Sequence, residues 1–86
     1  MQKKTVIYTI NPCPYCQRAK DLLNRKKIVF EEVLIDRNDD EARMELAKKS
    51  SMRTFPQIFY GEKLIGGYSE LQALEDNKTL EKVFEL

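Results

Sequence analysis

Residues 5–16 read TVIYTINPCPYC, and this stretch decides the fold. Its first half is rich in β-branched and aromatic residues, which favours a buried strand. Pro12 and Pro14 cannot continue that strand, because proline has no backbone N–H to donate. Pro14 suits the first turn of a helix, where the missing donor costs nothing. The stretch therefore predicts a strand that leads through a short loop into a helix, with Cys13 and Cys16 at the junction.

The helix after this junction is amphipathic, with apolar residues at helical spacing on one side and polar residues on the others. It is expected to end near Lys26-Lys27, because cations suit the carboxyl end of a helix. The residues expected to face the core are Cys16, Ala19, Leu22 and Leu23.

The rest of the chain alternates between strand and helix patterns. The expected elements are a strand over 28–35, a helix over 41–49, a hairpin of strands over 55–60 and 63–65, a helix from residue 69 and a last short helix near 80–84. Ser69 to Gln72 has the form of a capping box, which sets the start of that helix at Ser69. In the 41–49 helix, Ala42, Met44 and Leu46 are expected to face inward.

The element order is therefore β-α-β-α-β-β-α-α. A β-α-β unit followed by a hairpin and helices closes most simply as a four-stranded mixed sheet with helices on both faces. We expect a single α/β domain over residues 1–86.

Composition limits the classes of function. The chain has 86 residues, and 42% hydrophobic with 34% charged residues is typical of a globular protein. The formal net charge is +1, from 15 basic and 14 acidic residues, so we expect no nucleic-acid partner. No apolar stretch is long enough to cross a bilayer, and the run at residues 5–10 is too short for a signal peptide. We expect no membrane association and a cytoplasmic location.

The chain contains two cysteines and no histidine. A Cys-His protease, a Ser-His-Asp hydrolase and a histidine-ligated metal site are therefore excluded. Two cysteines also cannot complete a four-thiolate zinc site within one chain, so we expect no metal site.

Cys13-Pro14-Tyr15-Cys16 between a strand and a helix is typical of a redox-active dithiol. One helical turn brings the two sulfurs within disulfide reach. Cys13 lies at the helix N-terminus, where unpaired N–H groups and the helix dipole stabilise a thiolate. We expect Cys13 to attack substrate disulfides and the more buried Cys16 to resolve the mixed disulfide. The alternatives are a structural cysteine pair or half of a metal site between subunits.

Two further motifs are ambiguous on their own. Thr54-Phe55-Pro56 precedes the hairpin, and in this topology its loop abuts the N-terminus of the first helix. From the residues alone, an ordinary trans proline is the simpler interpretation. The 66–70 segment, GGYSE, permits close backbone approach and offers free N–H groups to a carboxylate, although a hairpin exit with a helix cap explains it equally simply. Tyr15 is either an exposed turn residue or a ring beside the reactive sulfur.

Together, the motifs at residues 13–16, 54–56 and 66–70 resemble those of the glutaredoxin family, and the resemblance extends over the whole chain. The resembling segments are 6–9, 13–16, 18–23, 54–59 and 65–70. The resemblance implies a thioredoxin fold, a cis peptide before Pro56, and reduction of protein disulfides and protein–glutathione mixed disulfides. It implies glutathione as co-substrate and electron donor, with no tightly bound cofactor. The implied partners are disulfide-bonded or glutathionylated proteins, ribonucleotide reductase among them.

The resemblance also implies a glutathione site, in which Tyr68, Ser69 and Glu70 hold the γ-glutamyl end. The residues that match the family's contacts are Tyr15, Thr54, Phe55, Pro56, Gly67, Tyr68, Ser69 and Glu70. The sequence departs from the family at Ile10, where a lysine or arginine is usual, and either Arg37 or Arg53 is expected to substitute. Pro12 is a second departure, at a position where Thr, Ser or Gly is commoner.

The sequence leaves three alternative functions. A thioredoxin-reductase-linked redoxin is disfavoured by Tyr15 and by the Tyr68–Glu70 segment. A dimer that shares a [2Fe-2S] cluster through Cys13 and glutathione resembles monothiol relatives, and Pro14 and Cys16 disfavour it. A non-catalytic adaptor is disfavoured by the intact Cys-x-x-Cys motif.

Overall fold

The computed structural model describes residues 3–86, so Met1 and Gln2 of the expected 1–86 domain lie outside the described residues. The expected order β-α-β-α-β-β-α-α is confirmed. The elements are β1 (Thr5–Ile10), α1 (Pro14–Arg25), β2 (Phe30–Ile35), α2 (Asp40–Ser50), β3 (Gln57–Tyr60), β4 (Lys63–Gly66), α3 (Tyr68–Asp76) and α4 (Leu80–Val83). Within residues 3–86, none of the helices has the length and apolar character needed to span a membrane.

The four strands form one mixed sheet, as expected, and the structure gives its strand order as β2-β1-β3-β4. β1 runs parallel to β2, with Thr5 opposite Phe30 and Ile10 opposite Ile35. β3 is antiparallel to β1, and it starts with Gln57 opposite Tyr8. This register places the loop before β3 beside the loop that follows β1. The sheet thus brings Pro56 and Cys13 to the same end of the molecule.

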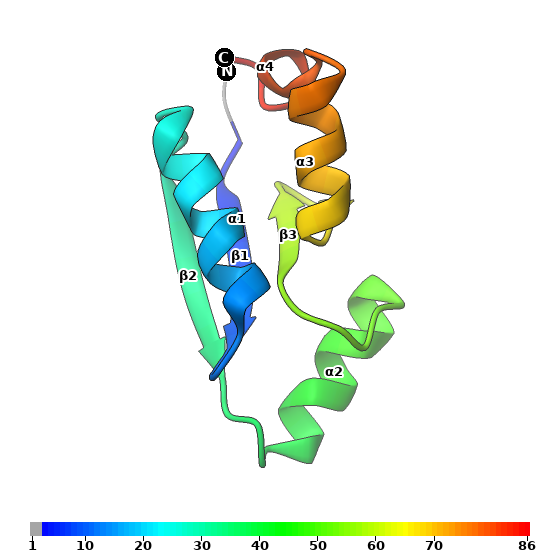
Figure 1. Ribbon diagram of the computed structural model, residues 1–86. Coiled ribbons are helices and arrows are strands. Elements are labelled where there is room, and N and C mark those ends of the chain that lie inside the picture. Colours follow the sequence, from blue (N-terminus) through cyan, green and yellow to red (C-terminus); the bar gives the residue numbers. More distant parts are fainter. Residues whose placement is uncertain (1–2) are drawn as a thin grey trace.

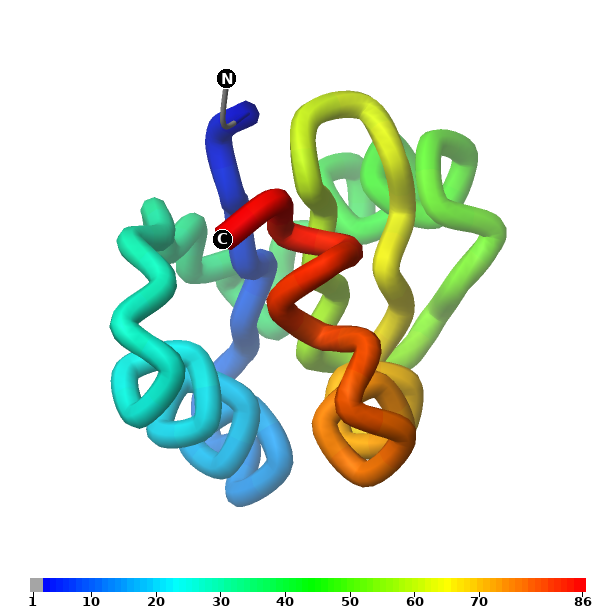
Figure 2. Tube along the Cα trace, turned by 90° about the horizontal axis from the view of Figure 1, so that it is seen from above, coloured from blue at the N-terminus to red at the C-terminus, as the bar shows by residue number. Residues whose placement is uncertain are grey.

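The helices cover both faces of the sheet (Figures 1 and 2). α1 and α3 lie side by side on one face, and α2 lies on the other. Between α1, α3 and the sheet is a cluster of buried apolar side chains, closed at one end by α4. Its buried members are Ile7, Ala19, Leu22, Leu23, Ile28, Ile58, Tyr60, Leu71, Leu80 and Phe84.

Helix α1 follows the sequence prediction closely. Pro14 occupies its first turn, Cys13 caps it, and Lys26 ends it. All four residues predicted to face the core are buried. Their burial fixes the rotation of α1 about its axis, and with it the direction in which Cys16 points.

Helix α2 differs from the prediction. Met44 was expected to face inward, and its side chain is 61% exposed. Only Leu46 and Ser50 of this helix are buried. A narrow stripe of α2 meets the sheet, where the ammonium of Lys49 lies over the rings of Tyr8 and Phe59. Met44 falls outside this stripe.

The start of α3 also corrects a prediction. The helix begins at Tyr68, and Gly67 rather than Ser69 is its N-cap residue. The Glu70 carboxylate accepts a hydrogen bond from the Gly67 N–H at 2.7 Å. This charge-assisted bond from the third helical residue back to the N-cap N–H is one half of a capping box. Glu70 therefore sets the start of the helix.

Two strands are shorter than predicted. β2 begins at Phe30 rather than at residue 28, because Val29 is 91% exposed and leaves Ile28 alone to pack into the core. β3 begins at Gln57, after Pro56, since proline cannot donate to the ladder.

The core makes a direct prediction about stability. Leu23→Ala is expected to lower the free energy of unfolding by about 2–5 kcal/mol, because Leu23 is fully buried and its truncation leaves a cavity. The matched change Leu34→Ala, at a side chain 56% exposed, is expected to cost about 1 kcal/mol or less. Urea unfolding followed by circular dichroism measures both. Equal losses would contradict the placement of the core between α1 and the sheet.

Candidate functional site

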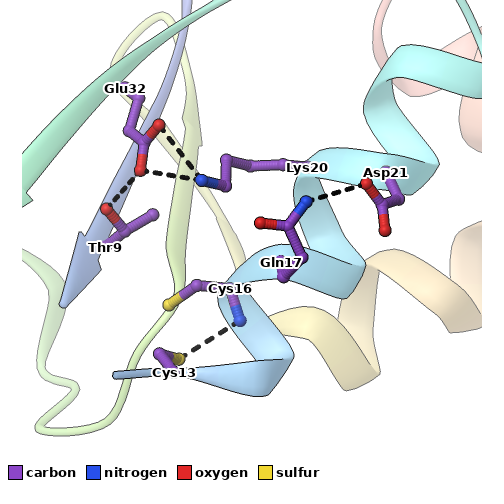
Figure 3. Close-up of polar contacts among 7 residues, drawn as sticks. All are labelled: Thr9, Cys13, Cys16, Gln17, Lys20, Asp21 and Glu32. Carbon is purple, nitrogen blue, oxygen red and sulfur yellow. Dashed lines mark hydrogen bonds and ion pairs between the residues drawn. The ribbon is translucent and has the colours of Figure 1, made fainter. Parts of the chain in front are cut away.

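The site is built around Cys13, the N-cap residue of α1. Its backbone is extended, with φ −154° and ψ 97°, which turns the side chain back over the first turn of the helix. The Sγ atom accepts a hydrogen bond from the N–H of Cys16 at 3.2 Å (Figure 3). Negative charge on this sulfur is stabilised by that N–H and by the positive end of the helix dipole. Both cysteines are free thiols, and Cys13 is partly exposed.

Cys16 has a different environment from Cys13. Its side chain is only 3% exposed. Burial, followed by the hydrogen bond to Cys13, raises the pKa of the Cys16 thiol to about 12, although the backbone of Ile10 and the charge of Lys20 act in the opposite direction. The two thiols of one helical turn are therefore unequal: one is accessible and placed to carry charge, and the other is buried and protonated.

The loop before β3 forms the opposite wall of the site. The Phe55–Pro56 peptide is cis, as the resemblance implied, and Asn11–Pro12 is cis as well, which was not predicted. The Phe55 carbonyl accepts a hydrogen bond from the Cys13 thiol at 3.8 Å. The predicted contact between this loop and the first cysteine is therefore present.

Gln57 holds this loop in shape, and it was not among the site residues predicted from the sequence. Its side chain is 1% exposed. The amide Nε2 donates to the carbonyls of Met52 and Thr54 at 3.2 and 3.0 Å. The signal in the sequence was a polar residue directly after Pro56, at a strand position where an apolar residue is usual.

The start of α3 closes the third side. A Cβ atom on Gly67 would lie 3.2 Å from the Pro56 carbonyl oxygen, so the absence of a side chain allows the helix to begin against the loop. Gly66 has φ +125°, and a Cβ there would lie 2.7 Å from the Glu70 side chain. Glycine is therefore required at residue 66 for the chain to turn into α3.

An aromatic pair joins the α1 and α3 sides of the site. The rings of Tyr15 and Tyr68 have centroids 5.9 Å apart, and the Arg18 guanidinium lies 5.2 Å from the Tyr15 centroid. Tyr15 remains 55% exposed, with Ser69 and Glu70 also on the surface. The three sequence motifs, far apart along the chain, thus meet around Cys13.

The two basic candidates lie on different sides of this site. Arg37 donates through Nε to the Asn11 carbonyl and through one terminal nitrogen to the Pro12 carbonyl, both at 3.0 Å. It therefore braces the loop that leads into Cys13. Arg53 lines a surface groove of about 800 Å³ between α2 and the loop before β3, together with Phe55. Arg43 lines the same groove and was not singled out from the sequence.

A polar network lies behind Cys16 (Figure 3). The Thr9 hydroxyl donates to Glu32 at 2.7 Å, and the ammonium of Lys20 lies 3.1 Å from the same carboxylate oxygen. The Thr9 hydrogen bond, together with Lys20, holds the pKa of Glu32 below its usual range. The Glu32 carboxyl is therefore ionised at neutral pH.

Comparisons with known proteins agree with this geometry. Residues 5–65 match the family model described as Glutaredoxin. The sequence is 51% identical over 70 residues to a glutaredoxin of Pseudomonas aeruginosa, covering 81% of this chain and 82% of that protein. It is 48% identical over 69 residues to glutaredoxin 3 of Escherichia coli K12, covering 80% and 82%. The solution structure of a Brucella melitensis glutaredoxin matches with a TM-score of 0.81 and 44% identity, covering 96% of this chain and 89% of that one.

The unequal thiols predict a simple labelling experiment. Iodoacetamide at neutral pH is expected to modify Cys13 at least about tenfold faster than Cys16, because the accessible thiolate is the nucleophile and burial hinders the second thiol. Peptide mass spectrometry after timed quenching measures both rates. In denaturant the two rates should converge, which is the control. Faster labelling of Cys16 in the folded protein would contradict the site geometry.

Proposed function

The chain belongs to the glutaredoxin family of thiol–disulfide oxidoreductases and has the thioredoxin fold, and we propose that it reduces protein disulfides and protein–glutathione mixed disulfides with electrons from glutathione. The observation that carries the proposal is the position of the Cys13 sulfur. It lies at the N-terminus of α1, accepts the Cys16 N–H, and is partly exposed. A thiolate placed in this way is available to a disulfide that approaches from solvent.

The proposed chemistry is thiol–disulfide exchange. With a glutathionylated protein, the Cys13 thiolate attacks the glutathione sulfur, the mixed disulfide breaks, and the protein leaves as a thiol. A glutathione thiolate then attacks the Cys13-bound glutathione, which releases glutathione disulfide and restores Cys13. With an internal protein disulfide, Cys13 becomes bonded to the substrate, and Cys16 attacks the Cys13 sulfur to release the reduced protein. Two glutathione molecules then reduce the Cys13–Cys16 disulfide.

We assign the γ-glutamyl end of glutathione to the start of α3. This group carries a carboxylate and an ammonium side by side. The N-terminus of α3 favours the carboxylate through its dipole. The Glu70 carboxylate, which is exposed and lies in the first turn of α3, suits the ammonium. Tyr15 and Tyr68 offer an aromatic surface to the peptide between this end and Cys13.

The glycyl carboxylate of glutathione requires a cation in place of Ile10, which is buried. We assign this role to Arg37, because its guanidinium lies against the Asn11 and Pro12 carbonyls beside Cys13. Two of its five N–H groups are used there, which leaves three for a carboxylate. The contacts proposed along the middle of the peptide are the backbone and side chains of Thr54, Phe55 and Pro56. A single domain working in the reducing cytoplasm completes the proposal.

Substitution of each cysteine tests the division of labour. Cys13→Ser is expected to abolish both activities, because a serine hydroxyl is not ionised at neutral pH. Cys16→Ser is expected to keep removal of glutathione from a glutathionylated protein, and to lose at least about tenfold of protein-disulfide reduction, because intramolecular resolution is lost. Coupled assays with glutathione and glutathione reductase measure both reactions. An active Cys13→Ser protein with an inactive Cys16→Ser protein would reverse the assigned roles.

Chemical-shift mapping tests the glutathione site. In the Cys16→Ser protein, a glutathione mixed disulfide on Cys13 is expected to shift the backbone amides of Tyr68, Ser69 and Glu70, because the γ-glutamyl group docks on the start of α3. Two-dimensional ¹H–¹⁵N spectra of the labelled protein provide the measurement.

The matched control is a mixed disulfide with cysteinylglycine, which lacks the γ-glutamyl group. It should shift the amide signals around Cys13 and leave the amide signals of residues 68–70 unchanged. If both adducts shift residues 68–70 equally, the γ-glutamyl group does not bind there.

A further inference from the structure

Lys20 and Cys16 lie on the same side of α1, one helical turn apart. Figure 3 shows Lys20 extending from the helix toward β2, on the side where the Cys16 sulfur points, while Gln17 turns to Asp21. The ammonium of Lys20 lies 3.2 and 3.1 Å from the two carboxylate oxygens of Glu32. The Lys20 side chain is 23% exposed and the Glu32 side chain 35%, so the pair is partly shielded from water.

Glu32 has a fixed position because a second group holds it. Thr9, 1% exposed, donates its hydroxyl hydrogen to Glu32 at 2.7 Å. Thr9 is in the central strand β1, and Glu32 is in the neighbouring strand β2. The carboxylate is therefore tied to the sheet on one side and to α1 on the other. This arrangement holds the flexible Lys20 side chain beside the buried end of the dithiol.

Cys16 needs the positive charge of Lys20 only when it reacts. It attacks the Cys13 sulfur as a thiolate. Burial and the neighbouring Cys13 oppose its ionisation, whereas the Ile10 backbone and the Lys20 charge favour it. Two titratable side chains on the neighbouring elements face residues of α1. Glu32 of β2 is paired with Lys20, and Tyr68 of α3 lies against Tyr15.

We propose that Lys20, held in place by Glu32 and Thr9, is a positioning residue for the resolving step and sets the rate at which Cys16 displaces the partner from Cys13. The proposal deepens the proposed function and rests on its assignment of Cys13 as attacking and Cys16 as resolving thiol. In this step Cys16 gives its proton to water and its thiolate attacks the Cys13 sulfur. The bond from Cys13 to the partner breaks, and the partner leaves as a thiolate that takes up a proton. The two cysteines are oxidised to a disulfide, and the partner sulfur is reduced.

The size of the effect follows from exchange chemistry. If loss of the Lys20 charge lowers the thiolate fraction of Cys16 about tenfold, the remaining thiolate is about threefold more nucleophilic, so the resolving step slows by about threefold. Glu32→Gln acts in the opposite direction, because the amide oxygen can still accept from Lys20 and Thr9 and hold the ammonium in place, whereas the negative charge that offsets it is gone. The paired variants therefore predict opposite signs, which a general loss of packing cannot produce.

The experiment uses the full-length reduced protein and one equivalent of dipyridyl disulfide in a stopped-flow spectrometer. This reagent is uncharged and releases one absorbing pyridinethione when Cys13 attacks it and a second when Cys16 resolves the adduct. The second release measures the resolving step without glutathione, so failure of the glutathione proposal does not affect it. The variants are Lys20→Met, Lys20→Arg and Glu32→Gln. Their controls are Arg25→Met, an exposed cation of the same helix, and Asp21→Asn, an exposed hydrogen-bonded carboxylate of the same helix.

The expected result is a second phase about threefold slower in Lys20→Met and faster in Glu32→Gln, with a wild-type rate in Lys20→Arg and in both controls. The first phase should stay unchanged in all five variants. The ratio of wild type to Lys20→Met should fall in high salt, because ions screen a partly exposed charge. Equal second phases in wild type and Lys20→Met, or a slower one in both Lys20→Met and Glu32→Gln, would overturn the proposal. Release of only one pyridinethione would instead show that Cys16 does not resolve the adduct and would overturn the assignment of roles.

Discussion

The hydrogen bond from the Cys16 N–H to the Cys13 sulfur is the interaction on which the rest of the site depends. It exists only if Cys13 is extended while the residues after it are helical, and Pro14 favours that change of conformation at the first position of α1. The helix must in turn be fixed against the sheet, which the buried face of α1 provides. The bond therefore links the reactive sulfur to the hydrophobic core, and a shift of α1 would alter the chemistry as well as the packing.

The features that the sequence predicted well are local ones. The strand ending at Ile10, the helix starting at Pro14 and its four buried residues follow from hydrophobic periodicity and from proline geometry within one segment. The element order followed for the same reason. The start of α3 was misplaced because two capping boxes overlap in the sequence, and the structure uses Gly67 with Glu70 rather than Ser69 with Gln72. Met44 was misplaced because periodicity identifies a helical face without giving the width of its contact.

The features that the sequence did not predict depend on contacts between distant segments. Arg37 reaches the carbonyls of Asn11 and Pro12 only because β1 and β2 are parallel neighbours whose ends coincide. Glu32 interrupts an apolar strand pattern, and its role depends on two distant residues. The sheet places Thr9 beside it, and α1 places Lys20 within hydrogen-bond distance. A single sequence records the charge of each residue, whereas the register between strands decides which charges meet.

Glu32 also affects association between molecules, because it lies in β2, an edge strand of the sheet. An edge strand presents unpaired backbone groups to which a strand of another molecule can add, and charged residues that point inward discourage such addition. A second molecule that paired along β2 would have to approach Glu32 and also Glu31, whose carboxylate is held by Lys4 at 2.8 Å. Association through this edge would remove charged groups from water without supplying new partners for them. The carboxylate that anchors the cation behind the dithiol thus also helps to keep this small sheet from growing into an aggregate.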